Sequence, residues 1–158
     1  MATEDKVYHL IKLLLYVAKE EGTEVTATKL QKTFFLLEKE GGINLNLGFK
    51  PWFFGPYSSL LQDYVDRLIE KGDVSVEERE VKDVLSGQVV GYKRVYVLSS
   101  DFNAGQDDES VKEFFRKWVK MSRGEILNYV YRKYPEYARY SLIRDKVLGA
   151  INEQEEKV

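Results

Sequence analysis

Donor side chains gather in the first turns of a helix that is expected to begin after Thr26, a good N-cap. Hydroxyl, amide and ammonium groups on an exposed helical turn suit the phosphates or base edges of DNA. A later hairpin offers two further cations for the flanking DNA backbone. The candidate nucleic-acid-binding residues are therefore Thr28, Lys29, Gln31 and Lys32 on the helix and Lys93 and Arg94 on the hairpin.

Acidic side chains near these candidates favour a different use. Phosphate is repelled by carboxylates on the hairpin and on the third expected helix. In the alternative interpretation, the lysines form a solvated face and the fold makes contacts with a protein, since a fold alone does not determine function. Double-stranded DNA and a protein both stay open as partners. The repelling carboxylates are Glu77, Glu78, Glu80 and Asp83, and Asp63, Asp66 and Glu70.

An aromatic segment lies at residues 49–59, where four large rings precede a predicted Gly-Pro turn. A bent aromatic segment can expose rings that form a pocket for a ligand or a partner. The alternative is that the rings seal the junction between the first helix, the third helix and the hairpin, because large rings usually supply core area first. The candidate pocket residues are Trp52, Phe54, Gly55, Pro56, Tyr57 and Ser58.

Metal and catalytic chemistry find little support in the sequence. The chain has no Cys and one His, His9, whereas zinc sites need thiolates and imidazoles in groups. Asp63 and Asp66 share a helix face and could hold Mg²⁺, but Arg67 and Lys71 lie near enough to balance them. Neither a Ser-His-Asp arrangement nor a glycine-rich phosphate loop occurs. We therefore expect no metal, no cofactor and no enzyme activity.

Hydrophobic periodicity predicts an α+β fold, mainly α, in a single domain spanning residues 1–158. The first helix spans residues 5–21, and the second runs from Thr26 to Gly41. The third opens with a Ser59–Gln62 capping box and ends at Gly72. Residues 73–100 alternate as a β-hairpin with a turn at 85–88. This order, three helices and then a hairpin, is winged-helix-like for residues 1–100.

A C-terminal helical part is expected over residues 106–152, after a polar linker. Its three helices lie around residues 111–121, 124–134 and 136–151, and Pro135 separates the last two because proline cannot continue a helix interior. Between the second and third helices, residues 43–49 fit a short strand or an extended loop. The winged-helix-like part therefore carries a helical extension.

Size and charge place the chain in a broad class. At 158 residues with 44% hydrophobic content it can cover one core. The formal net charge of −2 is not the basic balance of many nucleic-acid binders, so any DNA-binding charge must be segregated. No run of 18 apolar residues and no basic, apolar leader occurs. We expect a cytoplasmic protein with no membrane contact.

Two spaced motifs resemble a recurring prokaryotic family. They are Lys29-Leu30-Gln31-Lys32 and, further on, Gly55-Pro56-Tyr57-Ser58. The first half of the chain is similar to YwgA-type proteins of bacteria and archaea and, more distantly, to SocA-type, antitoxin-associated (Panacea-like) domains. The resemblance implies a winged-helix-like fold and a regulatory or toxin-antitoxin role. The leading hypothesis is a homodimeric, DNA-associated winged-helix-like regulator without catalytic activity. The alternative is a protein-interaction module of a toxin-antitoxin or stress system that does not bind DNA.

Overall fold

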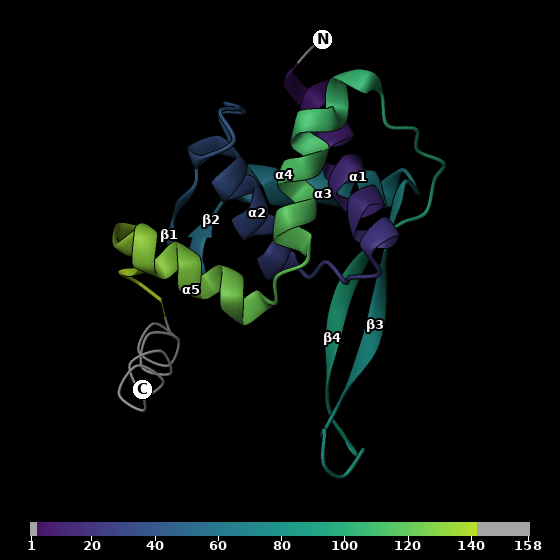
Figure 1. Ribbon diagram of the computed structural model, residues 1–158, viewed down its shortest axis with the longest axis vertical. Helices are drawn as coiled ribbons and strands as arrows, with labels where there is room; N and C mark the ends of the chain where they lie inside the picture. The colour runs from purple at the N-terminus through teal and green to yellow at the C-terminus, as the bar shows by residue number, and fades with distance from the viewer. Residues whose placement is uncertain (1–2, 142–158) are drawn as a thin grey trace. The chain divides into compact units, whose positions relative to one another are not determined.

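The computed structural model describes residues 3–141 and has an α+β architecture of helices and two small antiparallel sheets (Figure 1). The helices predicted before Pro135 and the hairpin predicted over residues 73–100 are present. None of the described helices is long and apolar enough to cross a bilayer. In chain order the elements are α1 (Thr3–Glu21), α2 (Ala27–Lys39), β1 (Lys50–Trp52), β2 (Gly55–Tyr57), α3 (Ser59–Glu70), β3 (Val74–Lys82), β4 (Val89–Leu98), η1 (Gln106–Asp108), α4 (Glu109–Val119), α5 (Arg123–Lys133) and η2 (Pro135–Ala138).

The described residues fall into two compact units that interleave along the chain. Unit 1 comprises residues 3–27 and 63–120, and unit 2 comprises residues 28–62 and 121–141. The units do not follow the predicted division near residues 100–106, because unit 1 continues through α4. A single domain and a winged-helix-like arrangement therefore stay predictions, and each unit is described by itself.

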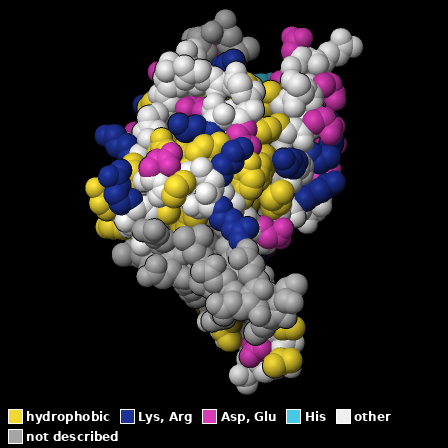
Figure 2. Space-filling model, turned by 60° about the vertical axis from the view of Figure 1, so that its left-hand side comes forward, with side chains coloured by type: hydrophobic (Ala, Val, Ile, Leu, Met, Phe, Trp, Pro, Cys, Tyr) yellow, Lys and Arg dark blue, Asp and Glu magenta, His cyan; other side chains and the backbone are white. Residues whose placement is uncertain are grey.

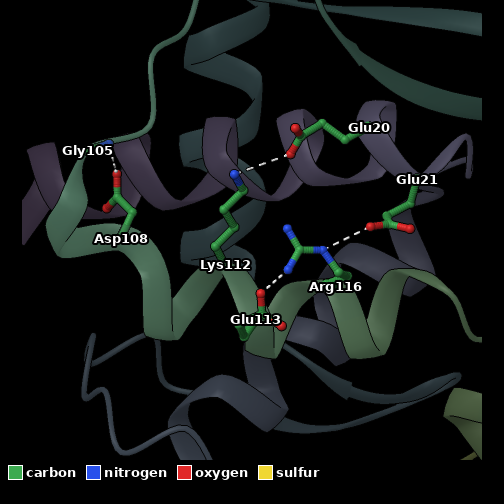
Figure 3. Close-up of polar contacts among 7 residues, drawn as sticks. All are labelled: Glu20, Glu21, Gly105, Asp108, Lys112, Glu113 and Arg116. Atoms are coloured by element: carbon green, nitrogen blue, oxygen red, sulfur yellow. Dashed lines mark hydrogen bonds and ion pairs between the residues drawn. The ribbon is translucent and has the colours of Figure 1, made fainter.

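In unit 1, α1 packs along α4 and ion pairs line their contact (Figure 3). Lys112 lies 3.5 Å from Glu20, and the Nε of Arg116 donates to Glu21 at 2.9 Å. Half-buried His9 contacts Asp108 at 2.9 Å, so it is a paired edge residue of the helix contact. Among the residues that the structure describes, no group of three or more potential ligands could hold a metal ion.

The β3–β4 ribbon is the second part of unit 1 and projects beyond α1 and α4 (Figure 1). Its base is anchored, since Val74 and Val95 are buried and the Tyr96 amide donates to the Val25 carbonyl at 2.8 Å. Further out both strands are exposed, and the register shifts at Val81 by a bulge or irregularity. Apolar side chains remain visible at its far end (Figure 2, lower end).

Unit 2 is built around the aromatic and aliphatic side chains of α2 and α5. The helix α2 is buried on every face from residue 29 to residue 37, and β1 and β2 form a small hairpin that contacts α5 and η2. Residues 43–49 form a loop and no strand. The buried side chains of α2 and α5 in unit 2 include Leu30, Phe34, Phe35, Leu36, Leu37, Ile126, Leu127, Val130 and Tyr131.

Three local predictions need correction or fall outside the description. The tight turn is formed by Phe53 and Phe54, and Gly55-Pro56 lie within β2, where a two-stranded sheet tolerates proline at its edge. The side chain that caps α3 is Ser58, one residue earlier than expected, because its Oγ accepts from the Leu61 amide at 3.0 Å. The last helix, expected over 136–151, lies mostly outside the described residues; its described start is the short helix η2.

Candidate functional site

The polar residues at the start of α2 are buried and do not form an exposed turn. Gln31 and Lys32 are each 2% exposed and Lys29 is 7% exposed, whereas Thr28 is half-buried. The expected exposure of Lys29, Gln31 and Lys32 is therefore wrong. The physical reason is that Gln31 and Lys32 serve backbone groups of residues 56–58, which are themselves buried in unit 2.

Gln31 holds the end of the small hairpin through a reciprocal pair of hydrogen bonds. Its Nε2 donates to the Ser58 carbonyl at 3.0 Å, and its Oε1 accepts from the Ser58 amide at 2.8 Å. The Ser58 Oγ in turn donates to the Leu47 carbonyl at 2.6 Å. One amide side chain thus satisfies both backbone groups of a residue that water does not reach.

Lys32 makes the second contact between α2 and the hairpin. Its Nζ donates to the Pro56 carbonyl at 2.9 Å. Burial and, to a smaller extent, the positive charge of Arg123 together lower the pKa of Lys32 to about 7. No carboxylate pairs with Lys32 within residues 3–141, so a neutral amine and an ammonium are both populated near pH 7.

Gly55 allows the hairpin to approach α2 and α5 closely. Its φ of +89° lies in the left-handed region, and a Cβ at this position would lie 2.8 Å from the Tyr131 ring and 3.3 Å from Cε of Lys32. Burial raises the pKa of Tyr131, whose hydroxyl contacts Ser141 at 2.7 Å. We call Gln31, Lys32, Gly55 and Ser58 the clasp, because they join β2 to its two helices.

The clasp supports an exposed aromatic turn, defined as residues 52–54. Trp52, Phe53 and Phe54 are 51%, 46% and 42% exposed. The rings of Trp52 and Phe53 stack with centroids 4.9 Å apart, and the guanidinium of Arg123 lies 5.9 Å from the centre of the Phe54 ring. The alternative in which the rings seal a junction does not describe these three residues.

A pocket of about 390 Å³ opens beside the aromatic turn. Lys50 and Trp52 lie two residues apart on β1, so their side chains project on one face, and Tyr57 is the cross-strand partner of Lys50. Its lining residues are Gly48, Lys50, Trp52, Tyr57 and Ser59. Of the six predicted pocket residues, Trp52 and Tyr57 line this pocket, Phe54 lies on the aromatic turn, and Gly55, Pro56 and Ser58 are buried behind it.

The two ribbon candidates belong to unit 1, whereas the clasp and the aromatic turn belong to unit 2. The Nζ of Lys93 lies 2.7 Å from Glu24, so the cation is already paired with a carboxylate. Arg94 is exposed, and its cross-strand partner is Glu78. Each candidate cation on the ribbon therefore has an acidic neighbour, which lowers the positive potential that phosphate would meet.

Three residues of the site were not among the pocket candidates from the sequence: Lys50, Arg123 and Tyr131. Lys50 belongs to the aromatic segment, and alternation along a strand could have found Lys50 as a face-mate of Trp52. Nothing local marks Arg123 or Tyr131, because each reaches the hairpin from a helix about 70 residues away in the chain. Comparison with known protein families, curated proteins and solved structures gives no significant match.

Proposed function

We propose that this protein is a regulator without catalytic activity that binds another protein through the aromatic turn and its adjoining pocket. This is the protein-interaction alternative that the sequence left open. The proposal keeps the regulatory role, the cytoplasmic location and the winged-helix-like description that the YwgA-type resemblance implies. It moves the main contact from DNA to a protein.

The observation that supports this function most is the combination of exposed rings with a firmly held backbone. Three consecutive large rings are about half exposed, while the residues directly behind them are buried and hydrogen bonded. Aromatic side chains and arginine dominate the binding energy of protein interfaces. A contact element that is ordered before binding loses little conformational entropy on association. The aromatic turn meets both conditions.

DNA binding through α2 is less well supported by the same contacts. Three of its four candidate residues on that helix are buried, and the fold would have to open for them to reach phosphate. Lys93 would have to exchange Glu24 for phosphate. We therefore treat DNA binding as an outcome that the experiment must be able to detect.

The test is capture of partners from an extract of the source organism by the full chain and by two variants. The Trp52→Ala/Phe53→Ala double variant removes the stacked rings, and Tyr92→Ala removes an equally accessible ring from the ribbon. We expect a stoichiometric partner protein whose purified form binds the wild type and Tyr92→Ala alike. The double variant should bind that protein at least about 30-fold more weakly, as for a hot spot worth 2 kcal/mol or more.

Two results would overturn the proposal. One is a partner that binds the double variant as tightly as the wild type, provided that circular dichroism shows the variant folded. The other is salt-dependent binding to mixed genomic DNA that the double variant retains in full, because phosphate contact produces that salt dependence. The second result would restore DNA as the principal partner.

A further inference from the structure

The pocket beside the aromatic turn combines apolar walls with a cation at its edge. Trp52 and Tyr57 supply ring surface, and Lys50 supplies an ammonium group on the same face of the hairpin. A volume of about 390 Å³ is within the usual range for small-ligand sites and exceeds what one large side chain fills. The pocket can therefore admit a leucine-sized or aromatic side chain with part of its backbone.

Two cations at this site lack an acidic partner. Neither Lys50 nor Arg123 forms an ion pair with any residue in the described range 3–141. In the same unit, by contrast, Lys133 lies 2.9 Å from Glu40, which also accepts from the hydroxyls of Tyr129 and Tyr134. Lys93 on the ribbon is likewise paired, with Glu24. In a chain with formal net charge −2, Lys50 and Arg123 thus add two positive charges beside exposed rings.

One carboxylate of the same unit, Glu38, makes its contact elsewhere. Glu38 lies on α2, lines a neighbouring pocket, and accepts a hydrogen bond from the Leu47 amide at 3.1 Å. Its charge is thus used to hold the loop that leads to Gly48. Arg123 keeps its guanidinium over the Phe54 ring, which leaves donor groups at the ring's edge available to a ligand.

We infer that the partner presents a short acidic segment that carries one large apolar side chain. This inference rests on the proposed function. The apolar side chain enters the pocket against Trp52 and Tyr57. Carboxylates beside it meet Lys50 and Arg123, where desolvation by the rings strengthens the charge-assisted hydrogen bonds. A basic segment is excluded by the same two cations, so charge decides which segments bind.

The experiment is a fluorescence titration of the full chain with four synthetic peptides of equal length. The reference peptide has a central Leu flanked by Glu residues; the others replace Glu by Gln, Glu by Lys, or Leu by Ala. Trp52 is half exposed and Trp118 is buried, so binding at the site changes the emission of Trp52. We expect the Glu–Leu peptide to bind, and each replacement to weaken binding at least about tenfold.

Charge-reversal variants distinguish this inference from non-specific hydrophobic binding by the exposed rings. Lys50→Glu and Arg123→Glu should lose the acidic peptide and, combined, gain the Lys-flanked peptide, while Lys93→Glu on the ribbon should change neither affinity. Equal affinity of the wild type for the Glu and Gln peptides would overturn the charge requirement and leave the proposed function intact. The inference would also be overturned by a second result. In that result the acidic peptide does not bind, and a captured partner requires Trp52 but binds the Lys50→Glu and Arg123→Glu variants as tightly as the wild type. If no partner depends on Trp52, the proposed function fails with the inference.

Discussion

Residues 3–141 form two antiparallel hairpins, and the backbones of the two are supported in different ways. The β1–β2 hairpin is three residues a side, and buried hydrogen bonds of the clasp hold the backbone directly after its aromatic turn. The β3–β4 ribbon is nine to ten residues a side, and beyond its base it is exposed. A short hairpin presents its exposed rings in a defined geometry only when buried polar groups fix it, since an isolated two-stranded hairpin is marginally stable in water.

The exposed strand edges of the β3–β4 ribbon carry features that disfavour pairing with another strand. The strand β3 carries charged side chains at five of the six positions from Glu77 to Lys82, and the register shift near Val81 interrupts regular pairing. Charges and bulges of this kind discourage a second strand from adding to an exposed edge. The two hairpins therefore differ: one exposes large rings beside a buried, hydrogen-bonded backbone, and the other carries charges and a register shift along exposed strands.

The largest expected effect comes from placing the same small change in both hairpins. Gly55 and Gly87 both have positive φ, of +89° and +72°. A Cβ at Gly87 meets nothing within 4 Å, whereas at Gly55 it meets the Tyr131 ring at 2.8 Å. Gly87→Ala should cost about 1 kcal/mol of unfolding free energy from backbone strain alone. Gly55→Ala should cost about 3 kcal/mol, because overpacking adds to that strain.

Urea denaturation of both variants and the wild type measures this difference. Equal losses at the two glycines would mean that the hairpin does not press against Tyr131, and the clasp would lose its central contact. A Tyr131→Leu background should remove part of the excess cost at Gly55 and leave the cost at Gly87 unchanged.

The next effect is a pH dependence that the clasp alone should produce. Because the pKa of Lys32 is about 7 when folded and its ordinary value is 10.5, the unfolded state binds more protons between these two values. Stability should therefore rise with pH above 7, by at most about 1.4 kcal/mol per pH unit. Well below pH 7 Lys32 is protonated in both the folded and the unfolded state, so its contribution to the unfolding free energy no longer changes with pH.

Unfolding free energies from pH 7.5 to 9.5 test this expectation in wild type, Lys32→Met and Lys93→Met. The window ends there because burial and the hydrogen bond to Glu40 raise the pKa of Tyr134 to about 12, and the titration of Tyr134 adds its own dependence at higher pH. The rise should total about 2 kcal/mol in wild type and Lys93→Met, and should be absent in Lys32→Met. An identical rise in all three proteins would assign it to other groups.

Elements that depend on local patterns could be predicted from the sequence. The helical spacing of apolar residues located α1, α2 and α3, and strand alternation located β3 and β4, because periodicity is a property of neighbouring residues. The turn at Phe53-Phe54 was missed because glycine and proline normally mark turns, and here they follow one.

The site could be predicted only in part, because its decisive contacts are distant in sequence. Lys32 and Gln31 contact residues 24 and 27 positions away, and nothing in a Lys-Leu-Gln-Lys string distinguishes a buried donor from a solvated one. The exposed rings fell in a segment that composition had already marked. Composition could not predict which of these rings would be exposed and which residues would be buried.

The smallest expected effect is at the base of the ribbon, and it sharpens the contrast with the clasp. Lys93 and Glu24 are each about 40% exposed and lie 2.7 Å apart. Exposed pairs of this kind contribute about 0.2–1 kcal/mol and are screened by salt, so Lys93→Ala should lower the unfolding free energy by no more than that. Lys32→Ala, by contrast, leaves the buried Pro56 carbonyl without its donor and should cost about 1–3 kcal/mol.

The same Lys93 variant distinguishes the two uses of the ribbon. If the ribbon contacts phosphate, Lys93→Ala should weaken DNA binding and reduce the dependence of log affinity on log salt by about one. If the ribbon only protects its edges, neither quantity should change, and partner binding at the aromatic turn should be unaffected. A stability loss well above 1 kcal/mol would instead show that the ribbon base is as firmly built as the clasp, and the contrast between the two hairpins would fail.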